Sequence, residues 1–231
     1  MTKIILITGT SKGIGRFLAE TYLERGFKVI GCSRRTSKLE HNNYEHYHVD
    51  VSDEISVKKM VSSVYKMHKR IDYLINNAGF ASMNMSVLTP FETVENIFKT
   101  NFYGTFLFCR EVTRVMLRNK FGRIVNFTTM AVPLNLMGES IYASSKSAIE
   151  MFSHILAREI SSSGITCNTV GPSVTWTDMI KNVPKDKIDK VLNAQGIHEY
   201  ATFDDILNVV DFFLSDNSNM ITGQVVYLGG C

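Results

Sequence analysis

Short apolar runs alternate with amphipathic stretches along the whole chain. Six runs are rich in β-branched and aliphatic residues and lie at 3–7, 28–32, 73–76, 123–127, 165–170 and 224–228; a weaker seventh covers 45–49. Runs that are apolar on both faces are typical of strands buried in a parallel sheet. The stretches between them have the apolar spacing of helices. The pattern therefore predicts an α/β fold with a mostly parallel seven-stranded sheet covered by helices on both faces.

Two of the expected helices carry recognisable start signals. The segment TPFE at 89–92 combines an N-cap threonine, a proline at the first helical position and a capping-box glutamate. Thr202 and Asp205 predict a similar cap for the helix that follows. No repeat, low-complexity tract or linker interrupts the alternation, so we expect a single doubly wound domain over residues 1–231.

Composition narrows the class of protein. The 231 residues are 45% hydrophobic and 20% charged, as in globular proteins, and a net charge of +3 is too small to favour nucleic acid. No apolar run approaches the ~18 residues of a membrane span. The run near the N-terminus is too short for a signal peptide. The four cysteines are far apart and form no CxxC, which predicts reduced thiols and a cytoplasmic location. Neither the cysteines nor the six histidines show ligand spacing, so no metal site is expected, and the lack of a long apolar run predicts no membrane attachment.

A glycine-rich turn joins the first strand to the first helix. In this turn Gly9 would allow a sharp bend, Gly13 a close approach of backbone to a pyrophosphate, and Gly15 tight packing of helix on strand. The helix N-terminus would offer unpaired N–H groups to phosphate. An ordinary strand-to-helix turn with three glycines is the alternative. The position directly after the first strand favours a nucleotide.

The charges near the second strand indicate which nucleotide. NAD-binding folds of this type place an acidic residue near the end of that strand to bind the ribose 2′-hydroxyl. Here the strand ends in Ser33, Arg34 and Arg35, and Lys12 lies in the neighbouring loop. Arginine holds a 2′-phosphate by charge-assisted hydrogen bonds, whereas a carboxylate would repel it. We therefore expect NADP(H); solvated basic residues without a ligand are the alternative.

Tyr142 and Lys146 are four residues apart and would lie on one face of a helix. A free tyrosine has a pKa of about 10, and a nearby cation lowers that value by favouring the phenolate. This pair would suit proton transfer, although an accidental helical pair is the simpler reading of the spacing alone.

Five motifs in order resemble the short-chain dehydrogenase/reductase family: TGTSKGIG (8–15), NNAG (76–79), the asparagine of KTNFYG, YASSK (142–146) and NTVGPSVTWTDM (168–179). The resemblance covers essentially the whole chain and is strongest to the 3-oxoacyl-carrier-protein-reductase type. It implies a Rossmann fold and hydride exchange between NADP(H) and a small-molecule carbonyl or alcohol. It also implies a homotetramer or homodimer.

The resemblance further implies roles for individual residues. Tyr142 would be the general acid or base, and Lys146 would lower its pKa and hold the nicotinamide ribose. Asn101 would hold a water that links the lysine to solvent, and Thr129 would hydrogen-bond the substrate oxygen. The expected cofactor contacts are Gly9, Ser11, Lys12, Gly13, Ile14, Gly15, Ser33, Arg34, Arg35, Asp50, Val51, Asn77, Ala78, Gly79, Tyr142, Lys146, Thr175 and Thr177. For Asp50, capping of a turn before Ser52 is the alternative.

Two positions depart from the family pattern. Thr129 stands where a serine is usual; its hydroxyl can make the same bond, but the added methyl stiffens χ1 and crowds the site. Ser173 follows the proline where glycine is usual, and it would either narrow substrate access or shift the next loop.

The substrate side of the site is expected to be apolar. The residues expected to face the substrate are Phe80, Met83, Met130, Pro133, Leu134, Met137 and Trp176. The segment 179–201 would form a mobile cover whose lysines either attract an anionic handle or lie on a solvated helix face. Apolar residues beyond one helical stripe, expected at subunit contacts, are Phe98, Phe102, Phe106, Phe108, Ile149 and Phe152.

The leading hypothesis is an NADPH-dependent carbonyl reductase, or its reverse. An NADP-binding sensor or regulatory subunit is the alternative, with Thr129 and Ser173 marking weakened catalysis. A nucleotide-sugar epimerase or dehydratase is a third reading, but such relatives usually carry a C-terminal substrate domain for which this chain leaves no room.

Overall fold

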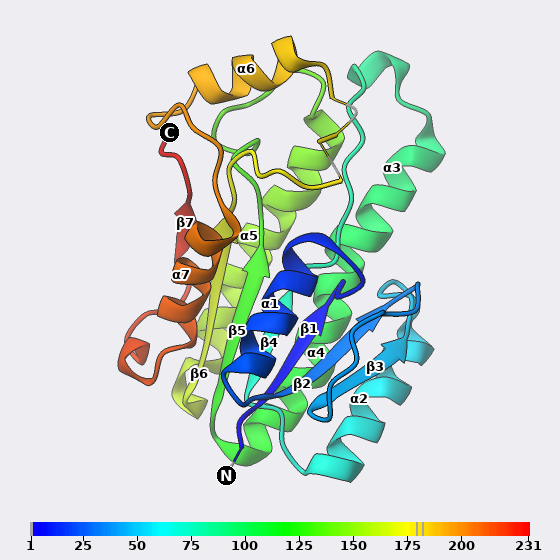
Figure 1. Ribbon diagram of the computed structural model, residues 1–231, viewed down its shortest axis with the longest axis vertical. Coiled ribbons are helices and arrows are strands. Elements are labelled where there is room, and N and C mark those ends of the chain that lie inside the picture. The colour runs from blue at the N-terminus through cyan, green and yellow to red at the C-terminus, as the bar shows by residue number, and fades with distance from the viewer. Residues whose placement is uncertain (1, 179, 182) are drawn as a thin grey trace.

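The computed structural model (Figure 1) describes residues 2–178, 180–181 and 183–231. Seven parallel strands form one sheet in the order β3-β2-β1-β4-β5-β6-β7. The strands are β1 (Ile4–Thr8), β2 (Lys28–Ser33), β3 (Tyr44–His48), β4 (Tyr73–Asn76), β5 (Gly122–Phe127), β6 (Ile165–Gly171) and β7 (Val225–Tyr227). All seven strands predicted from the apolar runs are confirmed, including the weak one that became β3.

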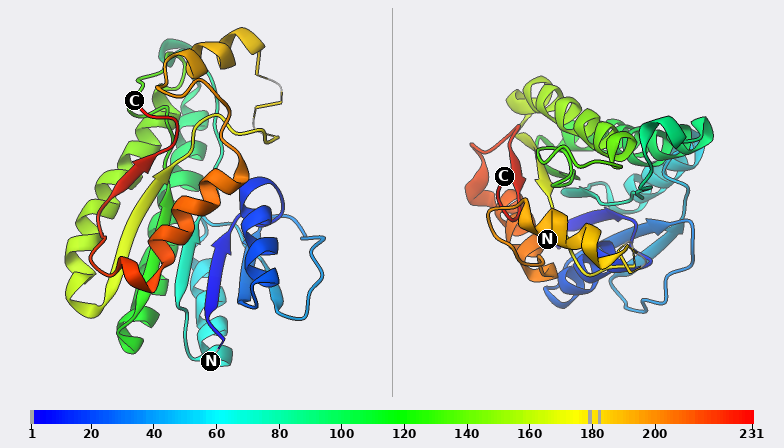
Figure 2. Two further views of the ribbon diagram at one scale, coloured as in Figure 1. Left: turned by 60° about the vertical axis from the view of Figure 1, so that its left-hand side comes forward. Right: turned by 90° about the horizontal axis from the view of Figure 1, so that it is seen from above.

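In the described residues, seven α-helices connect or cover the strands. They are α1 (Gly13–Glu24), α2 (Glu54–His68), α3 (Phe91–Phe98), α4 (Gly104–Asn119), α5 (Ser140–Ile160), α6 (Lys185–Asn193) and α7 (Phe203–Leu214). A π-helical turn, η2 (Lys99–Tyr103), joins α3 to α4, and single 3-10 turns are η1 (Ser86–Leu88), η3 (Ser161–Ser163) and η4 (Asp216–Ser218). Helices lie on both faces of the sheet, and α6 lies beyond one end of it (Figures 1 and 2).

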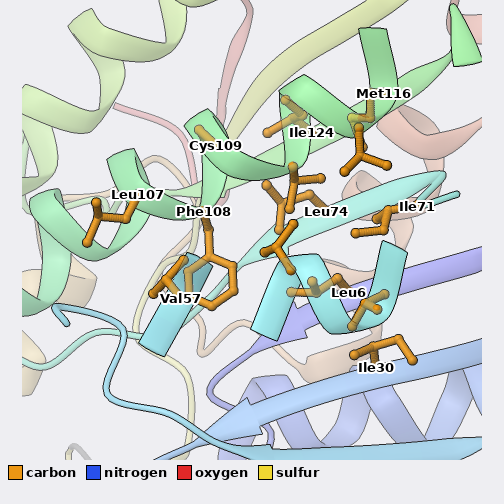
Figure 3. Close-up of a cluster of buried hydrophobic side chains, with 14 of the residues drawn as sticks. Leu6, Ile30, Val57, Ile71, Leu74, Leu107, Phe108, Cys109, Met116 and Ile124 are labelled. Atoms are coloured by element: carbon orange, nitrogen blue, oxygen red, sulfur yellow. The ribbon is translucent and has the colours of Figure 1, made fainter. Parts of the chain in front are cut away.

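Alternation along the strands divides the interior into two hydrophobic cores. Leu6 of β1 belongs to the core formed with α2, α4 and α5, where Phe108 is fully buried (Figure 3). Ile5 and Ile7, on the other face of the same strand, pack with α1 and α7. Successive strand residues point to opposite faces, and each face packs against an apolar core. Apolar residues are therefore favoured at every position of such a strand, which explains the continuous apolar runs of the sequence.

The two predicted helix caps have different outcomes. Thr202 and Asp205 form the expected reciprocal box: the Asp205 N–H donates to the Thr202 hydroxyl at 3.1 Å, and the Thr202 N–H donates to the Asp205 carboxylate at 2.8 Å. The cap predicted at Thr89 is wrong. Pro90 has an extended backbone (φ −60°, ψ 142°) and occupies the N-cap position itself, so α3 begins at Phe91, one residue later than predicted. The Thr89 hydroxyl donates to the Met85 carbonyl at 3.1 Å.

The order of the strands reverses between β1 and β4, which are neighbours in the sheet. Ligands of doubly wound sheets bind in the crevice outside the carboxyl ends of the strands at such a point. At the opposite edge, α2 and α4 end in left-handed residues, Lys69 (φ 62°) and Lys120 (φ 51°), which turn the chain back toward β4 and β5.

Within the described ranges, no helix is both long and apolar enough to cross a bilayer. The same residues contain no cluster of three histidine, cysteine or acidic side chains placed to hold a metal ion.

Candidate active site

Two adjoining cavities lie at the carboxyl edge of the sheet. The first, of 490 Å³, is lined by Tyr142 and Lys146 and is called here the tyrosine cavity. The second, of 450 Å³, is lined by Gly9 and Gly13 and is called the glycine-loop cavity. The two share wall residues, which are Ile14, Asn77, Gly79, Ala81 and Thr177. The two cavities are therefore neighbours at this edge of the sheet.

The glycines of the first turn have the conformations that the sequence suggested. Gly9 has φ +78°, and a Cβ there would lie 2.9 Å from the Asn77 side-chain nitrogen. A Cβ on Gly15 would lie 2.5 Å from the Gly9 carbonyl oxygen, too close for any other residue. Gly13 begins α1 and faces open space, with the nearest atom 4.0 Å from an added Cβ. The first N–H groups of α1, which lack partners within the helix, lie at the wall of the glycine-loop cavity.

Basic residues line the same cavity beside the end of β2. Arg34 and Arg35 are exposed, and Lys12 pairs with Asp178 at 3.1 Å. The Ser33 hydroxyl donates to the Arg35 carbonyl at 2.5 Å. Among the described residues that line this cavity, Asp178 is the one acid. The wall is thus positive at the position where a 2′-phosphate would be expected.

The other predicted cofactor contacts differ in which cavity they line. The residues that line the glycine-loop cavity are Ser11, Ile14, Val51, Asn77, Ala78, Gly79 and Thr177. Thr175 lines the tyrosine cavity instead. Asp50 is absent from both walls as described. Its carboxylate accepts hydrogen bonds from the Ser52 N–H at 2.9 Å and the Ser52 hydroxyl at 2.7 Å, the turn-capping alternative. Contact of Asp50 with adenine stays a prediction.

Helix α5 places Tyr142 and Lys146 one turn apart. The Lys146 Nζ lies 5.9 Å from the centroid of the Tyr142 ring and donates to the Phe127 carbonyl at 2.8 Å. Burial lowers the pKa of Lys146 to about 8, although the charge of Glu150 favours its cation. Burial raises the pKa of Tyr142 to about 12. Desolvation of the phenolate therefore determines the shift of the Tyr142 pKa, which is opposite to the lowering expected from Lys146 alone.

The two threonines after β5 point in different directions. The Thr128 hydroxyl donates to the Glu150 carboxylate on α5. Hydrogen bonding to the Thr129 side chain lowers the pKa of Tyr142 and partly opposes the effect of burial. The Thr129 hydroxyl also accepts from the Ala131 N–H at 3.3 Å. Thr129 is therefore the hydroxyl that lies beside Tyr142, as strand alternation predicted.

Asn101 lies in the π-helical turn η2 and is fully buried. Its side-chain oxygen accepts from the Phe80 N–H at 3.0 Å, and its nitrogen donates to the Phe80 carbonyl at 3.1 Å and to the Ser145 hydroxyl at 3.0 Å. A Cβ on Gly79 would lie 3.0 Å from the Asn101 oxygen and 3.4 Å from the Lys146 Nζ. Asn101 and Lys146 thus converge on Gly79, in a helical irregularity of a kind frequent at functional sites.

Ser173 uses its hydroxyl to hold a neighbouring segment. The hydroxyl donates to the side-chain oxygen of Gln195, which follows α6, and the Gln195 side-chain nitrogen donates to the Ile197 carbonyl at 3.1 Å. The Thr175 hydroxyl donates to the Ser173 carbonyl at 3.0 Å. The serine therefore ties the loop after β6 to the end of α6, which a glycine could not do.

The apolar wall of the tyrosine cavity differs from the predicted set. Met83 and Met130 line it, but Met137 and Trp176 are 88% and 62% exposed and lie outside it. Phe80 lines the glycine-loop cavity, and Pro133 and Leu134 belong to neither described wall. Much of the wall comes instead from the predicted cover: Ile180, Val183, Pro184, Lys187, Ile188 and Val191. Met179 and Asn182, also in that segment, lie outside the described residues.

One polar residue of the tyrosine cavity escaped the sequence reasoning. Glu139 immediately precedes α5 and lines the cavity three residues before Tyr142. The sequence did contain a signal for it. Glu139 lies three residues before Tyr142, about one helical turn away, so it could have been expected near the tyrosine.

The sequence is similar to those of known proteins. A sequence model of the family described as short chain dehydrogenase matches residues 3–188. The chain is 32% identical to the 3-oxoacyl-[acyl-carrier-protein] reductase of Escherichia coli over 234 residues, which cover 99% of this chain and 96% of the relative. It is 30% identical to the reductase of the same name from Staphylococcus epidermidis in an alignment of 240 positions. That alignment covers 100% of this chain and 98% of the relative.

Solved structures give the same result. The structure of ElxO with NADP bound superimposes with a TM-score of 0.91 at 26% identity and covers 99% of this chain and 97% of the other. The aldohexose dehydrogenase of Thermoplasma acidophilum superimposes with a TM-score of 0.89 at 25% identity over 99% and 93% of the two chains. On its sequence, its fold and the arrangement of this site, the chain belongs to the short-chain dehydrogenase family, a family of oxidoreductases.

Proposed function

We propose that the protein is an NADPH-dependent reductase that converts a carbonyl to an alcohol, or catalyses the reverse oxidation. The observation that carries this proposal is the meeting of the two cavities: Tyr142, Thr129 and Lys146 line one, the glycine-rich loop lines the other, and they share a wall. The names of the curated relatives, which are reductases, and the NADP in the ElxO structure support it.

The residues of the glycine-loop cavity fit a dinucleotide phosphate. A Cβ could not be accommodated at Gly9 or Gly15, because neighbouring protein atoms fill that space and hold the turn in its shape. Gly13 faces open space, so its backbone can approach a ligand closely. The first turn of α1 offers N–H groups to a pyrophosphate. Arg34, Arg35 and Lys12 would hold the 2′-phosphate. When bound, the reduced nicotinamide would supply the hydride to the carbonyl carbon.

Residues of this chain would handle the proton. Tyr142 remains neutral at pH 7 because burial raises its pKa to about 12, so it can donate its O–H to the carbonyl oxygen. As the carbon–oxygen π bond breaks, that oxygen takes the proton and becomes the alcohol. Lys146, with a pKa lowered to about 8, is mostly cationic at pH 7 and returns a proton to Tyr142. Thr129 would hydrogen-bond the same substrate oxygen, as a donor of the kind that stabilises developing negative charge.

The wider organisation is proposed on the same basis. The described part of segment 179–201, including α6, supplies much of the wall of the tyrosine cavity and would act as its mobile cover. Four free cysteines fit a reducing, cytoplasmic environment. The whole chain would act as one domain, because one sheet runs through it.

A homodimer or homotetramer would form through α4 and α5. Phe106 is 37% exposed and packs on Phe152 with ring centroids 5.8 Å apart. Met151 and Ile155 on α5 are 62% and 52% exposed and extend this apolar surface. Phe108 and Ile149, which the sequence grouped with these residues, are instead buried in the protomer at 0% and 1% exposure.

The test is NADPH consumption against a panel of ketones, acetoacetyl thioesters, diketones and keto sugars. Wild type, Tyr142→Phe and Thr129→Ser would be compared, with NADH as the cofactor control. We expect turnover with NADPH that is lost in Tyr142→Phe, because phenylalanine keeps the ring and removes only the proton donor.

Two results would oppose the proposal. Turnover that survives in Tyr142→Phe would remove the tyrosine from the reaction. NADPH binding without turnover of any substrate, together with activity gained in Thr129→Ser, would mean that the threonine had silenced the site. The alternative of an NADP-binding sensor or regulatory subunit would then be preferred.

A further inference from the structure

Glu139 is an acid placed where neither the fold nor the proposed proton transfer uses it. It occupies the N-cap position of α5, and its side chain makes no capping hydrogen bond. The residue is only 9% exposed. Its Oε2 is shielded from solvent and has no hydrogen-bond partner among the described residues. Buried polar atoms are seldom left in this state, which points to a partner that binds there.

The surroundings of Glu139 explain what kind of partner is missing. The tyrosine cavity that it lines is mainly apolar, with Met83, Leu136 and Val191 in the wall. An aliphatic chain filling this space would leave the carboxyl oxygen unpaired. A buried acceptor without a partner weakens binding by roughly tenfold or more relative to a ligand that supplies a donor.

Three other titratable groups face the same cavity. Tyr142 and Lys146 are on α5, and Lys187 is on α6. Lys187 lowers the pKa of Glu139 through its charge, but burial is the larger effect and raises that pKa to about 7. No ion pair joins Glu139 to Lys187 within the described part of the chain. The carboxyl therefore changes charge near neutral pH without a fixed protein partner.

We propose that Glu139 binds a hydroxyl group of the substrate, and that the preferred substrate is a carbonyl compound with a hydroxyl a few bonds from the reacting carbon. Glu139 lines the same cavity as Tyr142, and its charge raises the pKa of Tyr142, so the two side chains are near each other. A ligand whose carbonyl meets Tyr142 therefore brings its neighbouring carbons toward Glu139. A hydroxyl can donate to the carboxylate and accept from the neutral acid. An ammonium group fits less well, because Lys187 lies on the same wall.

This inference rests on the proposed reductase function and narrows its substrate class. The first test uses linear methyl ketones of equal length, unsubstituted or with one hydroxyl on successive carbons. At least one hydroxyketone should have a kcat/KM about tenfold above the unsubstituted ketone in wild type. In Glu139→Leu this preference should vanish through a higher KM for the hydroxyketone with little change in kcat, as expected when uniform binding is lost.

A conservative variant separates recognition from a merely structural role. Glu139→Gln keeps the shape and a hydrogen-bonding oxygen, so it should retain much of the hydroxyl preference. It should also lose the dependence of KM on pH near 7 that the wild-type carboxyl imposes. A fall in kcat/KM in Glu139→Leu that is equal for hydroxylated and unsubstituted ketones would overturn the proposal. A lower KM of the wild type for the matching aminoketone than for the hydroxyketone would also overturn it.

Binding gives a readout that does not require turnover. Saturation-transfer NMR on Tyr142→Phe with NADPH would compare the same ketones, and with Glu139→Leu added the hydroxyl preference should disappear. If wild type reduces none of the ketones but this binding preference is present, the reductase proposal fails while the hydroxyl site stands. If the unsubstituted ketones are reduced and neither measurement depends on Glu139, the hydroxyl site fails alone.

Discussion

The hydrogen bond from Ser173 to Gln195 gives the most direct test of how the cover is held. Gln195 is 3% exposed, and an added Cβ on Gly229 would lie 3.1 Å from its side-chain oxygen, so little room exists for a replacement water. Ser173→Ala removes the donor and leaves that oxygen unpaired. The net bond contributes about 1 kcal/mol and an unsatisfied buried acceptor costs ~1–3 kcal/mol, so we expect a loss of about 2 kcal/mol.

Thermal unfolding measures this loss. In a chain of this length 1 kcal/mol corresponds to ~2–4 °C, so Tm should fall by about 4–8 °C. Ser62→Ala on α2, where the serine is exposed, is the matched control and should change stability by less than ~0.5 kcal/mol. Hydrogen exchange should quicken around residues 195–197 in Ser173→Ala alone.

Ser173→Gly extends the test toward the residue usual in the family. It loses the same bond and adds backbone freedom costing ~0.5–1 kcal/mol, so it should be less stable than Ser173→Ala. Both variants should raise KM more than they lower kcat, because α6 walls the tyrosine cavity. A Tm for Ser173→Ala equal to that of the Ser62 control, with unchanged exchange near Gln195, would show that the bond is not formed in solution and refute the reasoning.

Three further predictions concern the two cavities. Carbonyl reduction should lose rate as pH rises through about 8, because Lys146 loses its positive charge there; a pH profile of kcat/KM that stays flat well above that value would exclude a required lysine cation. Gly15→Ala places a Cβ 2.5 Å from the Gly9 oxygen and should cost ~1–3 kcal/mol in denaturant unfolding while weakening NADPH binding; wild-type values in both measurements would contradict the close contact. Arg34→Ala should weaken NADPH binding ~10- to 100-fold in fluorescence titrations and leave NADH unchanged, whereas equal losses for both nucleotides would rule out a bond to the 2′-phosphate.

The fold was predictable because its signals are local and mutually consistent. Strands such as β1 and β5 are buried on both faces, so their apolar runs identify them without knowledge of their neighbours. The cap at Thr202 was predictable for the same reason, since both partners lie within one turn. Thr89 has the same sequence signal, but Pro90 adopts an extended backbone and delays the helix by one residue, which a short motif does not reveal.

The site was predictable where one segment supplies the geometry. The i, i+4 spacing places Tyr142 and Lys146 on one helix, and the direction of β5 separates Thr128 from Thr129. Contacts between distant segments were not predictable. The bond from Ser173 to Gln195 spans 22 residues, and its existence depends on how α6 returns to the sheet.

Glu139 shows a different limit of sequence reasoning. The spacing of Tyr142 and Lys146 predicts a proton-transfer pair, but the depth at which a neighbouring acid is buried depends on the whole cavity wall. Burial is what raises the pKa of Glu139 to about 7 and gives it an unpaired oxygen. Neither property can be read from the letters ESIY alone.

The left-handed residues that end α2 and α4 lie far from the cavities, so stability and activity can be changed at different places. Lys69 and Lys120 lie at the amino edge of the sheet, while both cavities open at the carboxyl edge. A non-glycine residue in this conformation costs roughly 1 kcal/mol, which glycine would relieve. Thermal robustness can thus be improved at one end of the protein while the chemistry at the other is redesigned, and the two kinds of engineering need not interfere.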